Sequence, residues 1–181
     1  MQSLLNHLSG IGFSPAENPA TPESILKLEA TVGVSIPHDY RDFMLSTGGG
    51  WCIAGAPCTE PTPFGDHVIN SFDSIDDVIG TLDSAVTPRN MISIGYGDGG
   101  AVTALALCGI DHGSVYSVDS EMRIHWNFNI KERFPDLDPS VARFFELRDS
   151  DGLPEKPWGY DNAYHVANSF KDFVLKLKDR H

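Results

Sequence analysis

The chain has 181 residues, 41% of them hydrophobic and 21% charged, and its formal net charge is −12. This length suits one domain, residues 1–181, whose core buries roughly two thirds of the unfolded surface, so stability requires neither a cofactor nor a disulfide. The acidity disfavours nucleic acid and anionic membranes as partners and favours basic proteins.

Targeting and cysteine patterns add little to this assignment. The N-terminus has no basic and apolar signal segment, and no apolar run approaches the roughly 18 residues of a membrane span, so we expect a soluble, cytoplasmic protein. Cys52, Cys58 and Cys108 form no C-x-x-C pair, which favours reduced thiols over a disulfide framework or a zinc site.

The N-terminal part of the chain predicts three helices. Leucines followed by a glycine predict a short helix over residues 4–10. A helix over 22–32 has Thr21 as its N-cap and a glycine just past its end. The next helix begins near residue 37, and the three glycines at 48–50 end it.

Two further helices are predicted, separated from the first three by an irregular segment. Residues 51–68 carry prolines and glycines without a clear period, so we expect a loop with at most a short strand. Ser74 and Asp77 form a capping-box signature at the start of a helix. The segment "SFKDFVLKLK" predicts an amphipathic helix at the end of the sequence, with inward side chains at Phe170, Phe173, Val174 and Leu177.

Residues 95–100, "GYGDGG", match the G-x-G-x-x-G pattern of a dinucleotide-binding loop. A buried strand precedes the motif and Asp119 follows its third glycine by 19 residues, where a ribose-binding acid would stand. However, the next segment is too short for a crossover helix, and no further alternation of strands and helices follows.

The same region therefore favours a meander of antiparallel strands. We expect strands at "MISIG", "AVTALALC", "SVYSVD" and "MRIHWNF", joined by turns at 97–100, "GIDHG" and "DSE". The glycine motif is then a turn, and no dinucleotide cofactor is expected.

Three segments resemble the SUKH superfamily, which contains bacterial toxin-immunity proteins and proteins like a fungal cell-wall assembly regulator. They are "ILKLEATVGVSIPHDYRDFMLSTGGG", "MISIGYGDGGAVTALALCGIDHGSVYSVDSE" and "VANSFKDFVLKL", and the resemblance spans about residues 22–178. It implies an α+β fold in which one antiparallel sheet is flanked by helices. The segment 129–165 is longer than this resemblance implies, which suggests an insertion that forms a partner surface.

The sequence offers no convincing catalytic or metal-binding arrangement. Asp111 and His112 are adjacent on a tight turn, so their side chains diverge. His125 is expected to be a surface histidine on its strand. Asp149 and Asp151 mimic the start of a calcium loop, but Tyr160 occupies the position of the last acidic ligand. We therefore expect no enzyme, no cofactor and no metal site, although an enzyme that uses Asp98, Asp111 or His125 stays an alternative.

Acidic residues and two tryptophans are the candidate partner-binding residues. Residues 66–111 carry seven acids against one base, Arg89. The candidates are Asp66, Asp73, Asp76, Asp77, Asp83, Asp98, Asp111, Trp51 and Trp158. Helix capping by some of the acids, a contribution of charge to solubility, and tryptophans that fold back over the core are the alternative interpretations.

The function expected from the resemblance and the charge is binding of a protein partner. An immunity protein of this kind would neutralise a cognate toxin, such as a basic nuclease, by covering its substrate cleft with an acidic surface. The alternative is a regulatory or scaffolding protein of the cell-wall regulator type. The sequence leaves the identity of the partner and the oligomeric state open.

Overall fold

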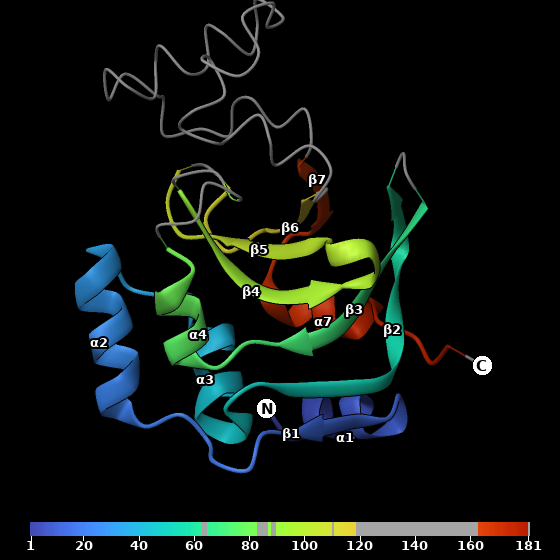
Figure 1. Ribbon diagram of the computed structural model, residues 1–181, viewed down its shortest axis with the longest axis horizontal. Helices are drawn as coiled ribbons and strands as arrows, with labels where there is room; N and C mark the ends of the chain where they lie inside the picture. The colour runs from blue at the N-terminus through green and yellow to red at the C-terminus, as the bar shows by residue number, and fades with distance from the viewer. Residues whose placement is uncertain (63–64, 83–86, 88–89, 110, 119–162, 181) are drawn as a thin grey trace, which may run out of the picture.

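The computed structural model describes residues 1–62, 65–82, 87, 90–109, 111–118 and 163–180. These residues form one curled, seven-stranded antiparallel sheet and the helices packed against it (Figure 1). The strands are β1 (Phe13–Pro15), β2 (Gly50–Thr62), β3 (Gly65–Phe72), β4 (Met91–Gly97), β5 (Val102–Ala106), β6 (Val115–Val118) and β7 (Ala163–Ala167). The helices are α1 (Gln2–Gly10), α2 (Pro22–Val32), α3 (His38–Thr47), α4 (Ile75–Gly80) and α7 (Phe170–Lys176), with a 3-10 turn η1 (Asp98–Gly100). The expected α+β class is confirmed.

The helices begin and end where their capping residues predict. Thr21 Oγ1 accepts a hydrogen bond from the N–H of Ser24 at 3.2 Å, and Gly33 ends α2 with a left-handed φ of 76°. Ser74 Oγ accepts from the N–H of Asp77 at 3.3 Å and so caps α4. These side chains satisfy backbone groups that the first turn of a helix leaves without partners.

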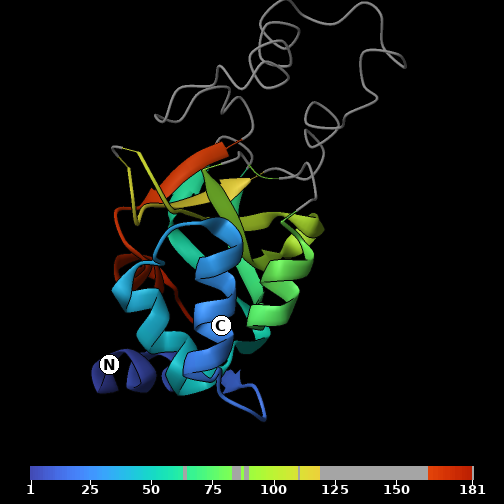
Figure 2. The ribbon, with the colours of Figure 1, turned by 90° about the vertical axis from the view of Figure 1, so that its left-hand side faces the viewer.

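Aromatic side chains from α3, α7 and the sheet form the centre of the core. The ring of Phe43 lies 5.0 Å from that of Phe72 and 4.9 Å from that of Phe170, and Tyr40 lies 5.1 Å from Phe170. Phe173 completes the group and, like Phe43 and Phe170, is fully buried. Figure 2 shows the helices on one side of the sheet, where they cover this core.

The glycine motif lies at a hairpin, as the meander interpretation predicts. Strands β4 and β5 are antiparallel neighbours, and η1 joins them directly. Because no helix crosses from one strand to a parallel one, the segment lacks the geometry of a dinucleotide-binding unit. Strands β5 and β6 continue the meander.

The expectation of a loop over residues 51–68 is wrong. Residues 50–62 form β2, the longest strand among the described residues, and β3 begins at Gly65. Register shifts interrupt the pairing of these strands on both sides of Ala56 and Pro57. Prolines are tolerated at such irregularities, so a sequence that is typical of a loop forms a bulged hairpin instead.

Strand β6 pairs with β5 on one edge and with β7 on the other, and the sequence did not predict β7. The strand expected over 122–128 lies outside the described residues, as do Asp83, Trp158 and the expected insertion up to residue 162. The last three residues of that expected insertion, 163–165, belong to β7.

Candidate functional site

Three consecutive glycines shape one end of the sheet. They connect α3 to β2, and all three have positive φ, with Gly49 at 97°. A Cβ on Gly49 would lie only 2.6 Å from the backbone oxygen of Phe72. The glycines therefore let the start of β2 pass close to the end of β3, which no residue with a side chain would allow without a shift of the backbone.

An open groove of about 680 Å³ lies at this end of the sheet, between β2, β4 and the segment that leads from β3 into α4. It is lined by Ala16, Gly48, Gly50, Trp51, Ser71, Phe72, Asp73, Ser74, Asp76, Asp77, Gly80, Thr81 and Tyr96. Four of the predicted partner-binding residues, Trp51, Asp73, Asp76 and Asp77, are thus brought together. None of the described lining residues carries a positive charge.

Two aromatic side chains flank the groove. Trp51 in β2 pairs with Ser71 in β3, and Ser71 pairs with Tyr96 in β4, so the three residues form one row across the sheet. Trp51 is 66% exposed and Tyr96 36%, whereas Ser71 is buried. Ile53, two residues beyond Trp51 on the same strand, is 82% exposed. The row therefore presents an apolar surface to solvent on the sheet face opposite the aromatic core.

Asp73 is the most unusual carboxyl group of the groove. It is only 8% exposed, and its Oδ2 has no hydrogen-bond partner. Burial, together with the charge of Asp77, raises the pKa of Asp73 to about 6, and the nearby Ser93 hydroxyl opposes this shift. The hydroxyl groups of Ser93 and Tyr40 are buried and have no hydrogen-bond partner. Burial, together with the charge of Asp73, raises the pKa of Tyr40. A polar group that is buried without a partner is costly, and such groups concentrate at functional sites.

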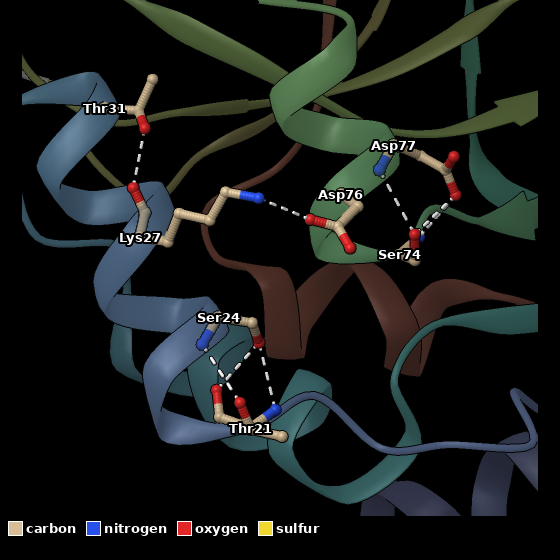
Figure 3. A network of polar contacts seen from close by, with 7 residues as sticks. All are labelled: Thr21, Ser24, Lys27, Thr31, Ser74, Asp76 and Asp77. Carbon is tan, nitrogen blue, oxygen red and sulfur yellow. Dashed lines mark hydrogen bonds and ion pairs between the residues drawn. The ribbon is translucent and has the colours of Figure 1, made fainter.

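The other two groove carboxylates lie on α4 and have neighbours (Figure 3). Asp77 closes the capping box, because its Oδ2 accepts a hydrogen bond from the Ser74 N–H at 3.4 Å, and it also accepts one from Ser74 Oγ at 2.6 Å. Asp76 Oδ1 pairs with Lys27 Nζ of α2 at 2.9 Å, and both side chains are largely exposed. The capping interpretation therefore holds for Asp77, while Asp76 remains accessible at the rim.

The remaining predicted residues lie away from the groove. Asp98 at η1 accepts a hydrogen bond from Asn70 and pairs with Arg180 at 2.7 Å; these contacts, that of Asn70 above all, lower its pKa. Asp111 accepts a hydrogen bond from the Tyr116 hydroxyl at 2.9 Å. Asp66 is exposed on β3.

Sequence reasoning missed Tyr96 and a buried polar triad. Tyr96 is part of the glycine motif, where it was counted only as a turn residue, although its position between two glycines at the end of a strand was a signal. In the triad, His67 Nε2 lies 2.8 Å from Thr103 Oγ1, and His67 Nδ1 lies 2.8 Å from Ser117 Oγ. His67 is only 2% exposed, and burial lowers its pKa to about 4. This neutral histidine joins three strands inside the protein.

The described part of the chain contains neither a metal-site arrangement nor a helix that could cross a membrane. There, no group of three histidine, cysteine, aspartate or glutamate side chains has the arrangement of a metal site. Within the same residues, no helix has the length and apolar character needed to cross a membrane.

Comparison with known proteins agrees with the antiparallel sheet and its flanking helices. The sequence model of the SMI1/KNR4 family (SUKH-1) matches residues 19–176, so the chain belongs to this family. A search of curated proteins found no match. Membership supports a role in binding a protein, of an immunity or a regulatory kind.

Proposed function

We propose that this chain is a non-enzymatic immunity protein, which binds a basic toxin domain inside the cell and blocks it through the groove face. The observation that carries the proposal is the meeting of exposed Trp51 with Asp73, Asp76 and Asp77 in one groove whose described lining has no positive charge. A net charge of −12 would speed association with a basic partner. The family to which the chain belongs supports protein binding of this kind.

The groove narrows the set of candidate residues. An exposed tryptophan beside an apolar strand face has the character of an interface anchor, and carboxylates around it supply specificity. Asp98 and Asp111 lie outside the groove lining, so we assign them a lesser part. Asp66 lies outside the groove lining and serves as a matched control.

The proposal is tested by capture of the partner from the organism that makes the protein. The tagged chain is washed at about 0.1 M and at about 0.5 M salt, because salt screens exposed charges more than buried contacts. The captured protein is identified, produced separately and tested for toxicity with and without the chain. A basic toxin that is retained less at high salt and is inactivated by the chain is the expected result.

Three variants separate the groove from general acidity. Asp76→Lys and Trp51→Ala should reduce capture, whereas Asp66→Lys should not. If Asp76→Lys and Asp66→Lys reduced capture of the partner equally, the groove would not be its binding surface, and the negative charge would serve solubility instead. A captured protein without toxic activity, together with a gene neighbourhood that lacks a toxin, would favour the regulatory alternative that the family also allows.

A further inference from the structure

We propose that the groove binds the guanidinium group of an arginine side chain of the partner, with Asp73 as the carboxylate and with Trp51 and Tyr96 on its two sides. This inference deepens the proposed function and rests on it, because it names the chemistry that the same surface recognises. The groove is expected to bind arginine in preference to lysine.

An incompletely paired carboxylate lies in the groove. Asp73 lines the groove, is more than nine-tenths buried and has an oxygen without a hydrogen-bond partner. The groups that face it offer no positive charge: they are the Tyr40 hydroxyl from α3, the Asp77 carboxylate from α4 and the Ser93 hydroxyl from β4. A guanidinium that enters the groove would place a positive charge beside this carboxylate, and hydrogen bonds between ions are the strong ones.

The spacing of the two aromatic residues suits a flat group between them. Trp51 and Tyr96 lie on either side of Ser71 in one row across three neighbouring strands. Neighbouring strands are about 4.8 Å apart, which puts the two aromatic residues about 10 Å apart at the backbone with only a small side chain between them. A flat group that contacts a ring on each face needs about 3.5–4 Å on each side, so one guanidinium fits.

Arginine fits this arrangement better than lysine does. A guanidinium is planar, stacks on aromatic rings and donates two parallel hydrogen bonds to one carboxylate, whereas an ammonium is a compact and strongly hydrated charge. A slot with aromatic residues on two sides and a carboxylate suits the first group better. The additional carboxylates, Asp76 and Asp77, attract any cation and so contribute less to the choice.

The test uses the intact chain and small probes. N-acetyl-arginine amide, N-acetyl-lysine amide and neutral N-acetyl-citrulline amide are titrated at millimolar concentration, and the resonances of the Trp51 indole, the Tyr96 amide and the Asp73 carboxyl are followed by NMR. We expect saturable shifts with the arginine probe, binding at least about threefold weaker with lysine, and no saturation with citrulline. Equal shifts with arginine and citrulline, or equal affinities for arginine and lysine, would overturn the inference.

Isosteric variants locate the binding. Asp73→Asn should weaken the arginine probe at least about tenfold, and Asp66→Asn should leave its affinity unchanged. The Asp73 carboxyl resonance should titrate at lower pH when the probe is bound. If the identified partner needs the groove but the arginine probe does not bind, this inference fails and the proposed function stands. If the probe binds but no partner responds to groove variants, the proposed function fails alone.

Discussion

Asp73 lowers the stability of the folded protein wherever it is ionised. Its pKa of about 6 exceeds that of an exposed aspartate, so between about pH 4 and 6 the unfolded chain loses a proton that the folded chain keeps. Stability therefore falls as the pH rises through this window and stays lower above pH 6. A residue that opposes folding at neutral pH and lines an exposed groove has the features of a functional residue.

Replacement of Asp73 by asparagine should therefore stabilise the protein. At pH 8 we expect the free energy of unfolding of Asp73→Asn to exceed that of the wild type by up to about 3 kcal/mol, and the gain should shrink towards pH 4. Urea unfolding at several pH values measures it. A destabilised Asp73→Asn protein at pH 8 would mean that the carboxylate is paired in the folded state.

His67 has the opposite effect on the pH dependence of stability. Its pKa is lowered to about 4, so between pH 6.5 and 4 this histidine is protonated in the unfolded chain but stays neutral in the folded protein. Stability supplied by neutral His67 is complete above pH 6.5 and is lost as the pH falls to 4, by about 3 kcal/mol. Because Asp73 acts in the reverse sense over nearly the same range, the two contributions partly cancel in the wild type.

A single variant separates the two contributions. His67→Gln should be less stable than the wild type at pH 7, because the geometry of the contacts with Thr103 and Ser117 is lost, and the difference should shrink as the pH approaches 4. The same urea series measures this difference. A constant difference across pH 4–7 would show that His67 titrates normally in the folded protein.

Among the elements, α2 is tied to two neighbours by ion pairs of different burial. Arg41 of α3 pairs with Glu29 of α2, whose side chain is only 13% exposed and whose Oε1 also accepts from the Ile36 N–H at 3.0 Å. Lys27 pairs with Asp76 of α4, and these side chains are 61% and 80% exposed. Burial strengthens a charge pair and makes its loss more costly, whereas exposed pairs contribute little.

The two pairs should respond differently to matched substitutions. Arg41→Met leaves Glu29 partly buried without its charged partner and should lower the free energy of unfolding by about 2 kcal/mol. Lys27→Met should change it by less than about 0.5 kcal/mol. Urea unfolding at neutral pH decides the matter, and equal effects of the two substitutions would contradict the assignment of Glu29 as the structural carboxylate between α2 and α3.

The accuracy of the sequence predictions also differs between kinds of element. Helices α2 and α4 were predictable because their caps, such as Thr21 and Ser74, lie next to them in the sequence. Strand β7 was not, since its partner β6 lies more than forty residues earlier. Pro57 and Pro61 made β2 resemble a loop, because its bulges depend on pairing with β3.

The candidate site was predictable in its parts but not in its arrangement. Trp51 and the acids of residues 73–77 were singled out by residue type alone. Their meeting in one groove depends on the sheet register, and the burial of Asp73 depends on the packing of α3 and α4. Tyr96 joins them only because β4 lies one strand beyond β3.

For the whole molecule, the question is whether its charge acts everywhere or at one place. A net charge of −12 attracts basic partners from any direction and makes association sensitive to salt. A specific interface adds contacts that slow dissociation, and these are lost only when the interface itself is changed. Charge reversals inside and outside the groove therefore distinguish long-range attraction by the net charge from specific contacts in the groove.

The most direct measurement is the dissociation constant of the purified partner with the wild type, Asp76→Lys and Asp66→Lys at physiological salt. Both variants change the net charge equally, but only Asp76 lines the groove. We predict that Asp76→Lys raises Kd at least about thirtyfold and that Asp66→Lys raises it less than about threefold. Equal effects of the two reversals would contradict the assignment of the groove as the partner-binding surface.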